Sequence, residues 1–173
     1  SGWTDTDGDG YVDKDGQKLS INWLTYPTRL EQPKLAEYAQ ATLKDIGIDV
    51  QVNNTPDHRT FAENGDFDVY VSSVTTAPTG DPEYFFTSTV TGSKNYGNYQ
   101  NEEVTKLTDQ LHQTFDKDER GKLAIELQQD ILDDDAYFFV SHLNMGIVTK
   151  SNVKGMATHP CDYYEITAEL DVE

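Results

Sequence analysis

The residues best suited to chemistry lie near the start of the chain, in an acidic loop rich in glycine. Side chains that carry oxygen alternate along this loop: Asp5, Asp7, Asp9, Tyr11 and Asp13. They match positions 1, 3, 5, 7 and 9 of an EF-hand-type loop, and Gly10 stands at position 6, where the sharp turn requires glycine. Alternate oxygen ligands can wrap a hard cation such as calcium, so this spacing is compatible with a calcium site.

The same loop also departs from the calcium-binding pattern. Position 12 is Gly16 instead of a bidentate glutamate, Asp15 comes one residue too early, and no helix precedes the loop. The alternative is a polar connecting loop built from Asp-Gly turns, without an ion, and the sequence leaves both interpretations open. In either case we expect the four aspartates at positions 1, 3, 5 and 9 of the pattern to converge, because alternation turns them inward.

Other metal ligands are scattered along the sequence. No two histidines have the spacing that forms a metal site on a helix, and there is no Cys-x-x-Cys. His159 and Cys161 bring an imidazole and a thiol close together, which soft metals accept, but two ligands are too few for a site. We therefore favour a surface histidine beside a buried cysteine. As Cys161 is the single cysteine, no internal disulfide can form.

Signatures of catalysis are missing from the sequence. It contains no nucleophile elbow, no phosphate-binding glycine loop and no His-Glu-x-x-His. Paired carboxylates are frequent only because acidic residues are frequent. We therefore expect a protein that is not an enzyme and requires no cofactor.

The charge of the chain excludes two classes of partner. Its 31 acidic and 13 basic residues give a formal net charge of −18, and no basic patch interrupts the acidic excess. Such a field repels nucleic acid and anionic membranes, which bind clustered Lys and Arg. No apolar run approaches the length of a membrane span.

The first half of the chain shows the periodicity of alternating strands and helices. Apolar residues that alternate with polar ones predict strands over about 19–25, 48–53 and 67–73. Between the first two, a stripe of Leu35, Ala39, Leu43 and Ile46 predicts a helix over 31–46, and Gly47 follows as its left-handed cap. A shorter helix is expected over about 55–63. Strands separated by helices of this length pair in parallel, so this part is predicted to be β-α-β-α-β.

The second half is predicted to be mainly helical. A helix over 101–116 begins at the cap residue Asn101 and has an apolar stripe that ends at Phe115. A further helix over 118–135 ends in three aspartates, which oppose the helix dipole and must be held by packing. Short strands are expected over 137–140 and 145–148, and an irregular tail from 151 onward.

Several segments resemble, in the same order, those of solute-binding protein family 5, the receptors of ABC importers for peptides and nickel. The segments are GWTDTDGDGY (2–11), DKDG (13–16), PTR (27–29), LKDIGIDV (43–50), GDFD (65–68), PTGDP (78–82), NEE (101–103), DER (118–120) and QQDILD (128–133). Each segment alone is weakly specific, but their order is fairly specific and covers nearly the whole chain.

The resemblance implies a fold and a place in a larger protein. It implies an α/β lobe of the periplasmic-binding-protein-like type II architecture, with a mainly parallel sheet flanked by helices. Residues 1–173 would be the carboxyl-terminal lobe of a bilobed receptor, made of the acidic loop 1–18, an α/β core 19–150 and a tail 151–173 that returns toward the other lobe. The receptor would be an extracytoplasmic monomer, in the periplasm or anchored as a lipoprotein, that delivers its solute to an ABC permease.

The solute would meet this lobe at the carboxyl ends of the parallel strands. The residues expected on that side are Tyr26, Arg29, Thr75, Thr76, Thr79, Thr158 and His159. Arg29 would hold a carboxylate; its alternative role is a surface pair with Glu31 or Glu37. The segments TAP (76–78) and GMATHP (155–160) resemble the nickel receptors, which places a nickel chelate slightly ahead of an oligopeptide as the solute. The alternative function is a calcium-dependent extracellular interaction module.

Overall fold

The computed structural model describes residues 2–144, 146–158 and 166–173. The chain forms two compact units, residues 1–73 and residues 74–173. Each unit has its own secondary structure and is described by itself.

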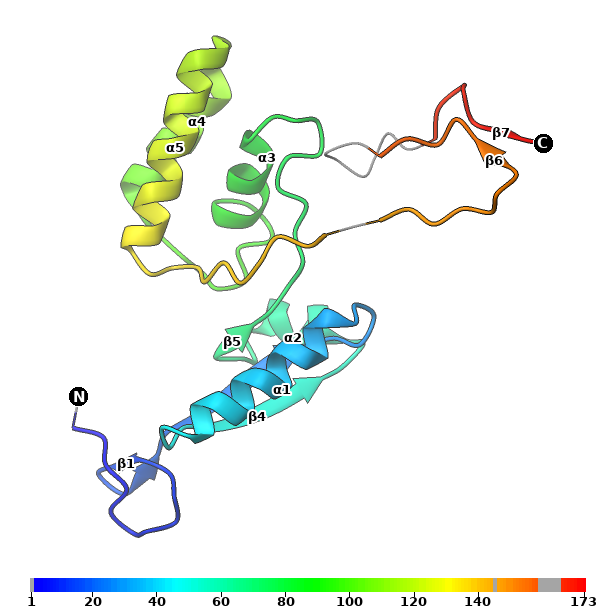
Figure 1. The fold of residues 1–173 in the computed structure, drawn as a ribbon. Coiled ribbons are helices and arrows are strands. Elements are labelled where there is room, and N and C mark those ends of the chain that lie inside the picture. The colour runs from blue at the N-terminus through cyan, green and yellow to red at the C-terminus, as the bar shows by residue number, and fades with distance from the viewer. Residues whose placement is uncertain (1, 145, 159–165) are drawn as a thin grey trace. The chain divides into compact units, whose positions relative to one another are not determined.

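The first unit is built on a three-stranded parallel sheet (Figure 1). Its strands are β3 (Ser20–Thr25), β4 (Asp49–Asn54) and β5 (Val69–Tyr70), in the order β4-β3-β5. β3 pairs with β4 along its whole length and with β5 at Trp23 and Leu24. The predicted parallel pairing is confirmed. The third strand is shorter than the predicted 67–73, because only two of its residues continue the ladder.

Two helices complete the β-α-β-α-β order of the first unit: α1 (Glu31–Lys44) and α2 (His58–Asn64). α1 buries Gln32 and Ala36 most deeply, whereas Leu35 is half-buried. Ile46 was wrongly placed on the buried stripe. It lies beyond the end of the helix and is 63% exposed, because the chain leaves the helical path there.

Gly47 turns the chain away from the path of α1. It also contacts the acidic loop. Its φ of +79° is the left-handed conformation expected of a helix cap. A Cβ atom at this position would lie 2.9 Å from Cγ1 of Val12, so the glycine also permits close contact with the loop. The Val12 amide donates to the Gly47 carbonyl at 2.7 Å. The loop itself closes through a short antiparallel ladder between β1 (Asp13–Lys14) and β2 (Gln17–Lys18).

The second unit is helical. Its elements are α3 (Glu83–Phe85), the π-helical turn η1 (Phe86–Val90), α4 (Glu102–Gln113) and α5 (Lys117–Asp133). Side chains from these elements form one apolar core, which includes Phe86, Val90, Val104, Leu107, Leu111, Leu127 and Ile131. The Asn101 side chain caps α4 and the Asp116 side chain caps α5, each by accepting two backbone N–H bonds.

Three predictions for the second unit were wrong in detail. α4 ends at Gln113, so Phe115 lies outside the buried stripe and is 92% exposed. Residues 137–140 and 146–148 form no strand in the described structure, because no neighbouring segment pairs with them. The tail is not wholly irregular, since β6 (Val153–Lys154) and β7 (Asp171–Val172) form a short antiparallel ladder.

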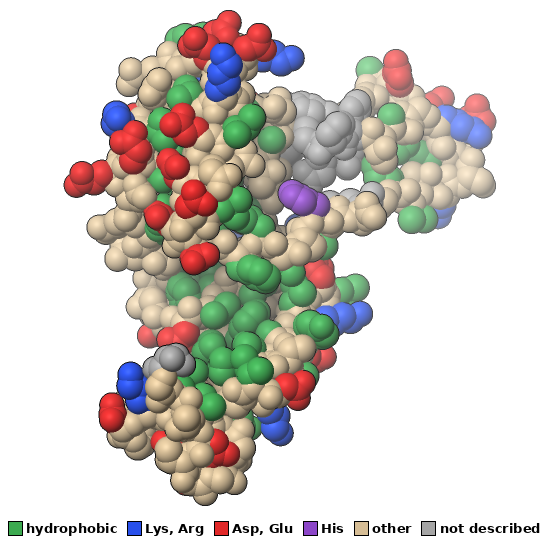
Figure 2. All heavy atoms as spheres, turned by 60° about the vertical axis from the view of Figure 1, so that its left-hand side comes forward, with side chains coloured by type: hydrophobic (Ala, Val, Ile, Leu, Met, Phe, Trp, Pro, Cys, Tyr) green, Lys and Arg blue, Asp and Glu red, His purple; other side chains and the backbone are tan. Residues whose placement is uncertain are grey.

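The observed fold is an α/β fragment with a small parallel sheet in one unit and mainly helices in the other. No helix in the described part of the chain is both long enough and apolar enough to cross a membrane. Acidic side chains dominate the charged surface on the face drawn in Figure 2, in keeping with the net charge of −18.

Candidate functional site

The carboxyl ends of all three parallel strands meet in one cluster of side chains in the first unit. Tyr26 follows β3, His58 begins the helix after β4, and Ser73 follows β5. The rings of Tyr26 and His58 stack, with their centroids 4.1 Å apart and an interplanar angle of 22°. The Tyr26 hydroxyl accepts a hydrogen bond from the Ser73 amide at 3.1 Å. We call these three residues, with Tyr70, the strand-end cluster.

Tyr70 holds the histidine of this cluster. Its hydroxyl lies 2.6 Å from Nδ1 of His58. Burial, and then the nearby charge of Arg59, lowers the pKa of His58 below its usual value. Which of the two atoms donates this hydrogen bond depends on the tautomer of the histidine ring. His58 and Tyr70 are both half-buried at this edge of the sheet.

A chain of polar side chains continues from Ser73 into α1. The Gln32 side-chain amide donates to the Ser73 hydroxyl at 3.0 Å, and that hydroxyl donates to the Glu31 carboxylate at 3.3 Å. Gln32 is 3% exposed, and its Oε1 has no hydrogen-bond partner within the described structure. A buried polar atom of this kind requires a partner such as an ordered water.

The residues predicted from the sequence occupy both units. Tyr26 is buried, at 7% exposed, and supports the cluster from within. Arg29 is exposed and, in the part of the chain that the structure describes, forms no ion pair with Glu31 or Glu37. Glu31 contacts Ser73 instead.

The predicted threonines belong to the second unit. Thr75 is half-buried, and Thr76 and Thr79 are exposed in the loop before α3. Thr158 is also exposed, whereas His159 lies outside the described residues. The structure thus brings Tyr26 together with other strand-end residues of the first unit. The threonines belong to the second unit.

Sequence reasoning missed His58, Ser73 and Gln32. A usable signal was present for His58, because it begins a helix directly after a predicted strand, at the same edge of the sheet as Tyr26. No comparable signal pointed to Gln32, since a glutamine in the first turn of a helix is ordinarily exposed.

The acidic loop has three converging carboxylates. One oxygen from each of Asp5, Asp7 and Asp13 lies within 4.8 Å of the others. Asp9 does not join them, because its carboxylate forms an ion pair with Lys18. The Lys18 ammonium also lies 4.5 Å from the centre of the Tyr11 ring. The prediction of four converging aspartates was therefore wrong for Asp9.

Hydrogen bonds within the loop already satisfy much of this charge. The Asp5 carboxylate accepts from the amides of Gly8 and Gly10 at 2.7 and 3.0 Å. The Thr6 hydroxyl, and then its amide, lowers the pKa of Asp13. The Lys18 side chain, and then the Tyr11 amide, lowers the pKa of Asp9. These bonds favour the ionised forms of Asp9 and Asp13.

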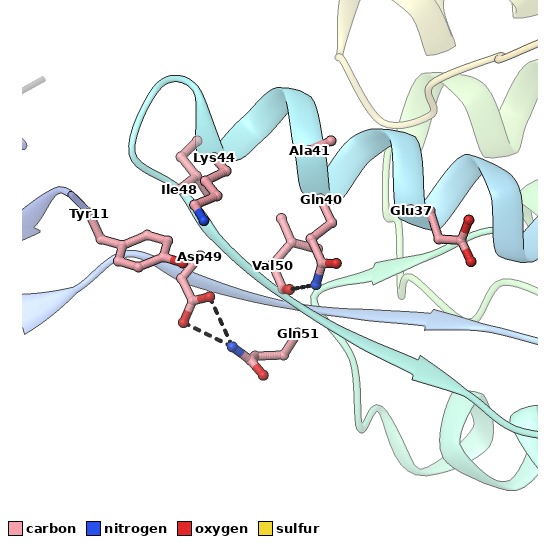
Figure 3. Close-up of a pocket in the computed structure, with 9 residues that line it drawn as sticks. All are labelled: Tyr11, Glu37, Gln40, Ala41, Lys44, Ile48, Asp49, Val50 and Gln51. Atoms are coloured by element: carbon pink, nitrogen blue, oxygen red, sulfur yellow. Dashed lines mark hydrogen bonds between the residues drawn. The ribbon is translucent and has the colours of Figure 1, made fainter. Parts of the chain in front are cut away.

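A hollow of about 380 Å³ lies elsewhere on the first unit (Figure 3). It is lined by the end of α1, the start of β4 and Tyr11. Two of its side chains are engaged, since Gln40 donates to the Val50 carbonyl and Gln51 donates to the Asp49 carboxylate. This hollow adjoins the amino end of β4, so it is distinct from the strand-end cluster.

Comparison with known proteins identifies the family. Residues 1–97 match the model of the bacterial extracellular solute-binding proteins, family 5 Middle. The chain belongs to this family. The resemblance seen in the sequence is thereby confirmed, and with it the expectation that the chain comes from a solute-binding family and is not an enzyme.

Relatives in the family include oligopeptide-binding and nickel-binding proteins. The oligopeptide-binding protein AppA of Bacillus subtilis is 31% identical over 96% of this chain, and the nickel-binding protein NikA of Staphylococcus aureus is 27% identical over 95%. The structure of AppA with a nonapeptide matches 92% of this chain and 32% of AppA with a TM-score of 0.76. A nickel ABC transporter structure from Bacillus halodurans matches 78% of this chain and 28% of its own, at 33% identity and a TM-score of 0.66. The chain spans 32% and 34% of the two curated relatives' lengths.

Proposed function

We propose that this chain is the carboxyl-terminal lobe of an extracytoplasmic receptor that delivers a solute to an ABC importer. The observation that carries the proposal is the strand-end cluster, in which Tyr26, His58 and Ser73 join the carboxyl ends of three parallel strands. Ligands of α/β proteins bind at this edge of a sheet. The full receptor would be a monomer with a second lobe, and the solute would be buried between the two.

An oligopeptide is the first solute class that we propose. The strand-end cluster contains the half-buried polar side chains of His58, Tyr70 and Ser73, and the exposed Arg29 offers a planar cation for a carboxylate. Peptides present backbone amides and a terminal carboxylate, which suit such groups. Similarity to AppA over 96% of this chain supports the same class.

A chelated nickel ion is the second candidate. Similarity to the nickel ABC transporter of Bacillus halodurans, at 33% identity, favours it. Within the described residues, the one group of three or more potential metal ligands is the triad of the exposed Asp5 and Asp7 and the half-buried Asp13. Nickel prefers nitrogen ligands to a cluster of carboxylates alone, so it would reach this receptor with a chelator already bound.

The acidic loop remains the proposed position of a structural calcium ion. The convergence of Asp5, Asp7 and Asp13 favours this, because a divalent cation would relieve the repulsion between three carboxylates. This role belongs to the solute receptor, and family membership makes it unnecessary to invoke a separate calcium-dependent interaction module.

Calorimetry on the full-length receptor tests the residue assignment. We expect Arg29→Ala and Thr76→Ala each to weaken binding of a nonapeptide or of nickel(II)–histidine by about tenfold, because each removes a polar contact to a buried solute. Lys34→Ala, at an exposed position on α1, is the matched control and should leave affinity unchanged. Unchanged affinity in both test variants would contradict the assignment.

A further inference from the structure

The Arg120 side chain joins three elements of the second unit, α3, α4 and α5. It extends from the first turns of α5 to the start of α3, where its Nε and Nη2 donate to the Asp81 carboxylate at 2.6 to 3.0 Å. Nη2 also donates to the Glu83 carboxylate at 2.8 Å. The paired geometry of guanidinium and carboxylate makes this contact both strong and directional.

The other arm of the same guanidinium reaches the end of α4. Nη1 donates to the carbonyls of Leu111 and Thr114, each at 2.6 Å. The Leu111 carbonyl also accepts from the Thr114 amide at 3.2 Å, so Arg120 adds a second bond there and one to the Thr114 carbonyl, just beyond the end of the helix. The side chain is only 15% exposed, which protects these bonds from competition by solvent.

Asp81 connects the Arg120 side chain to the loop that carries the threonines. Asp81 ends that loop. Its Oδ1 accepts a hydrogen bond at 2.9 Å from the amide of Glu83, the first residue of α3. One residue before it, the Gly80 amide donates to the Ala77 carbonyl at 3.0 Å and closes a turn that contains Thr79. Arg120 thus contacts the residue that follows a short turn, in which Thr79 is exposed; Thr76, also exposed, lies just before this turn.

We propose that Arg120 is a positioning residue, which holds the loop 75–80 in the conformation that presents Thr76 and Thr79 to the solute. This inference rests on the proposed function, because it assigns a purpose to the same threonines. Arg120 acts only through Asp81 and the turn, and it does not itself touch the solute. The alternative is that Arg120 only holds α3, α4 and α5 together, and that the conformation of the loop does not depend on it.

The test uses the full-length receptor with Asp81→Asn and Arg120→Lys. Asp81→Asn keeps an oxygen to cap α3 but removes the charge that pairs with Arg120, so it is the variant more certain to fold. Arg120→Lys keeps the charge but loses the planar fork. Lys106→Gln is the control, because it removes an exposed ion pair with Glu103 on α4.

Hydrogen exchange of the segment 75–82 and calorimetry give two separate readouts. We expect exchange in the segment to accelerate at least tenfold in both test variants, and affinity for a nonapeptide or nickel(II)–histidine to fall about tenfold. We also expect Thr76→Ala to cost less affinity in the Asp81→Asn background than in the wild type, because the loop no longer presents the threonine. If Arg120 only holds the three helices together, the variants would lower the melting temperature, but Thr76→Ala would cost the same affinity in the Asp81→Asn background as in the wild type.

The outcomes separate this inference from the proposed function. Unchanged exchange in the segment 75–82 would overturn the positioning role. Where Thr76→Ala by itself weakens binding, fully additive effects of Thr76→Ala and Asp81→Asn would overturn it as well. If Thr76→Ala and Arg29→Ala do not weaken binding in the wild type, the residue assignment of the proposed function is overturned. In that case faster exchange in both variants would still support Arg120 as the residue that holds the loop.

Discussion

The Tyr26 hydroxyl accepts a hydrogen bond from the backbone amide of Ser73, 47 residues away in the chain. The bond joins the end of β3 to the segment after β5 at the carboxyl edge of the sheet. It also holds the Tyr26 ring where it stacks on His58. This one contact therefore ties together the segments that follow all three strands.

Tyr26→Phe should destabilise the protein by about 1 kcal/mol, because the Ser73 amide loses its acceptor while the ring stack remains. Urea denaturation measures the change. Tyr38→Phe removes a hydroxyl from a side chain that is 71% exposed, so it should have no measurable effect. Equal effects of the two substitutions would contradict the role of the hydrogen bond.

The depressed pKa of His58 predicts that its contribution to stability changes with pH. The unfolded chain, with a histidine pKa of about 6.5, takes up a proton before the folded chain does. Stability contributed by neutral His58 is therefore present above about pH 6.5 and declines as the pH falls toward the lower pKa of the folded state. His58→Asn should flatten this part of the stability curve relative to the wild type.

Melting temperatures between about pH 7 and pH 5 provide the measurement, over the range in which histidine titrates. His142→Asn is the control, at an exposed histidine of the second unit. If His58→Asn and His142→Asn change the pH dependence equally, the half-buried environment of His58 is not its cause.

Asp134 explains how α5 can end in acidic residues. Its Oδ2 accepts from the Tyr99 hydroxyl at 2.6 Å and from the Asn101 side-chain amide at 2.7 Å. Burial, together with the bond to Asp134, raises the pKa of Tyr99 to about 12. Because the unfolded pKa of tyrosine is about 10, stability from the neutral hydroxyl is present below pH 10 and is lost as the pH rises toward 12.

Asp134→Asn should lower the pKa of Tyr99, because the neutral amide does not repel a phenolate. We expect the loss of stability above about pH 10 to begin at the same pH but to become smaller than in the wild type. Stability curves measured by urea at several alkaline pH values check this. Asp133→Asn is the control, because Asp133 accepts from Gln129 and not from Tyr99. A curve for Asp134→Asn that matches the control would contradict the assignment.

Calcium at millimolar concentration should raise the melting temperature, and EDTA should reverse the rise, if the acidic loop takes a cation as proposed. Asp7→Asn should abolish the rise, because Asp7 belongs to the converging triad. Asp15→Asn should preserve it, since Asp15 is not in the triad. An absence of any calcium effect in the wild type would leave the polar connecting loop as the correct interpretation.

Much of the first unit could be predicted from the sequence because its order is set by local periodicity. Alternation over 19–25 and 48–53 and the helix before Gly47 were enough to predict two parallel strands and their crossover. The burial of Gln32 was not predictable, because it depends on Ser73, which lies 41 residues away. The strand-end cluster depends on similar distant contacts, so only Tyr26 was found among its members.

The sequence was less informative where side chains compete for partners. Asp9 fits the spacing of a calcium loop, but Lys18 captures its carboxylate, and the spacing of the aspartates contains no sign of that ion pair. Residues 137–140 have the composition of a strand, yet a strand also needs a neighbour that pairs with it.

Calorimetry on the 173-residue chain and on the full-length receptor tests the central claim, that this chain supplies one side of a two-sided solute site. Circular dichroism should first show that the isolated chain retains its helices. We then expect the full receptor to bind a nonapeptide or nickel(II)–histidine with micromolar or tighter affinity, and the chain alone to bind neither at that level. Half a cleft leaves most of the solute in water. Micromolar or tighter binding by the isolated chain would contradict the account.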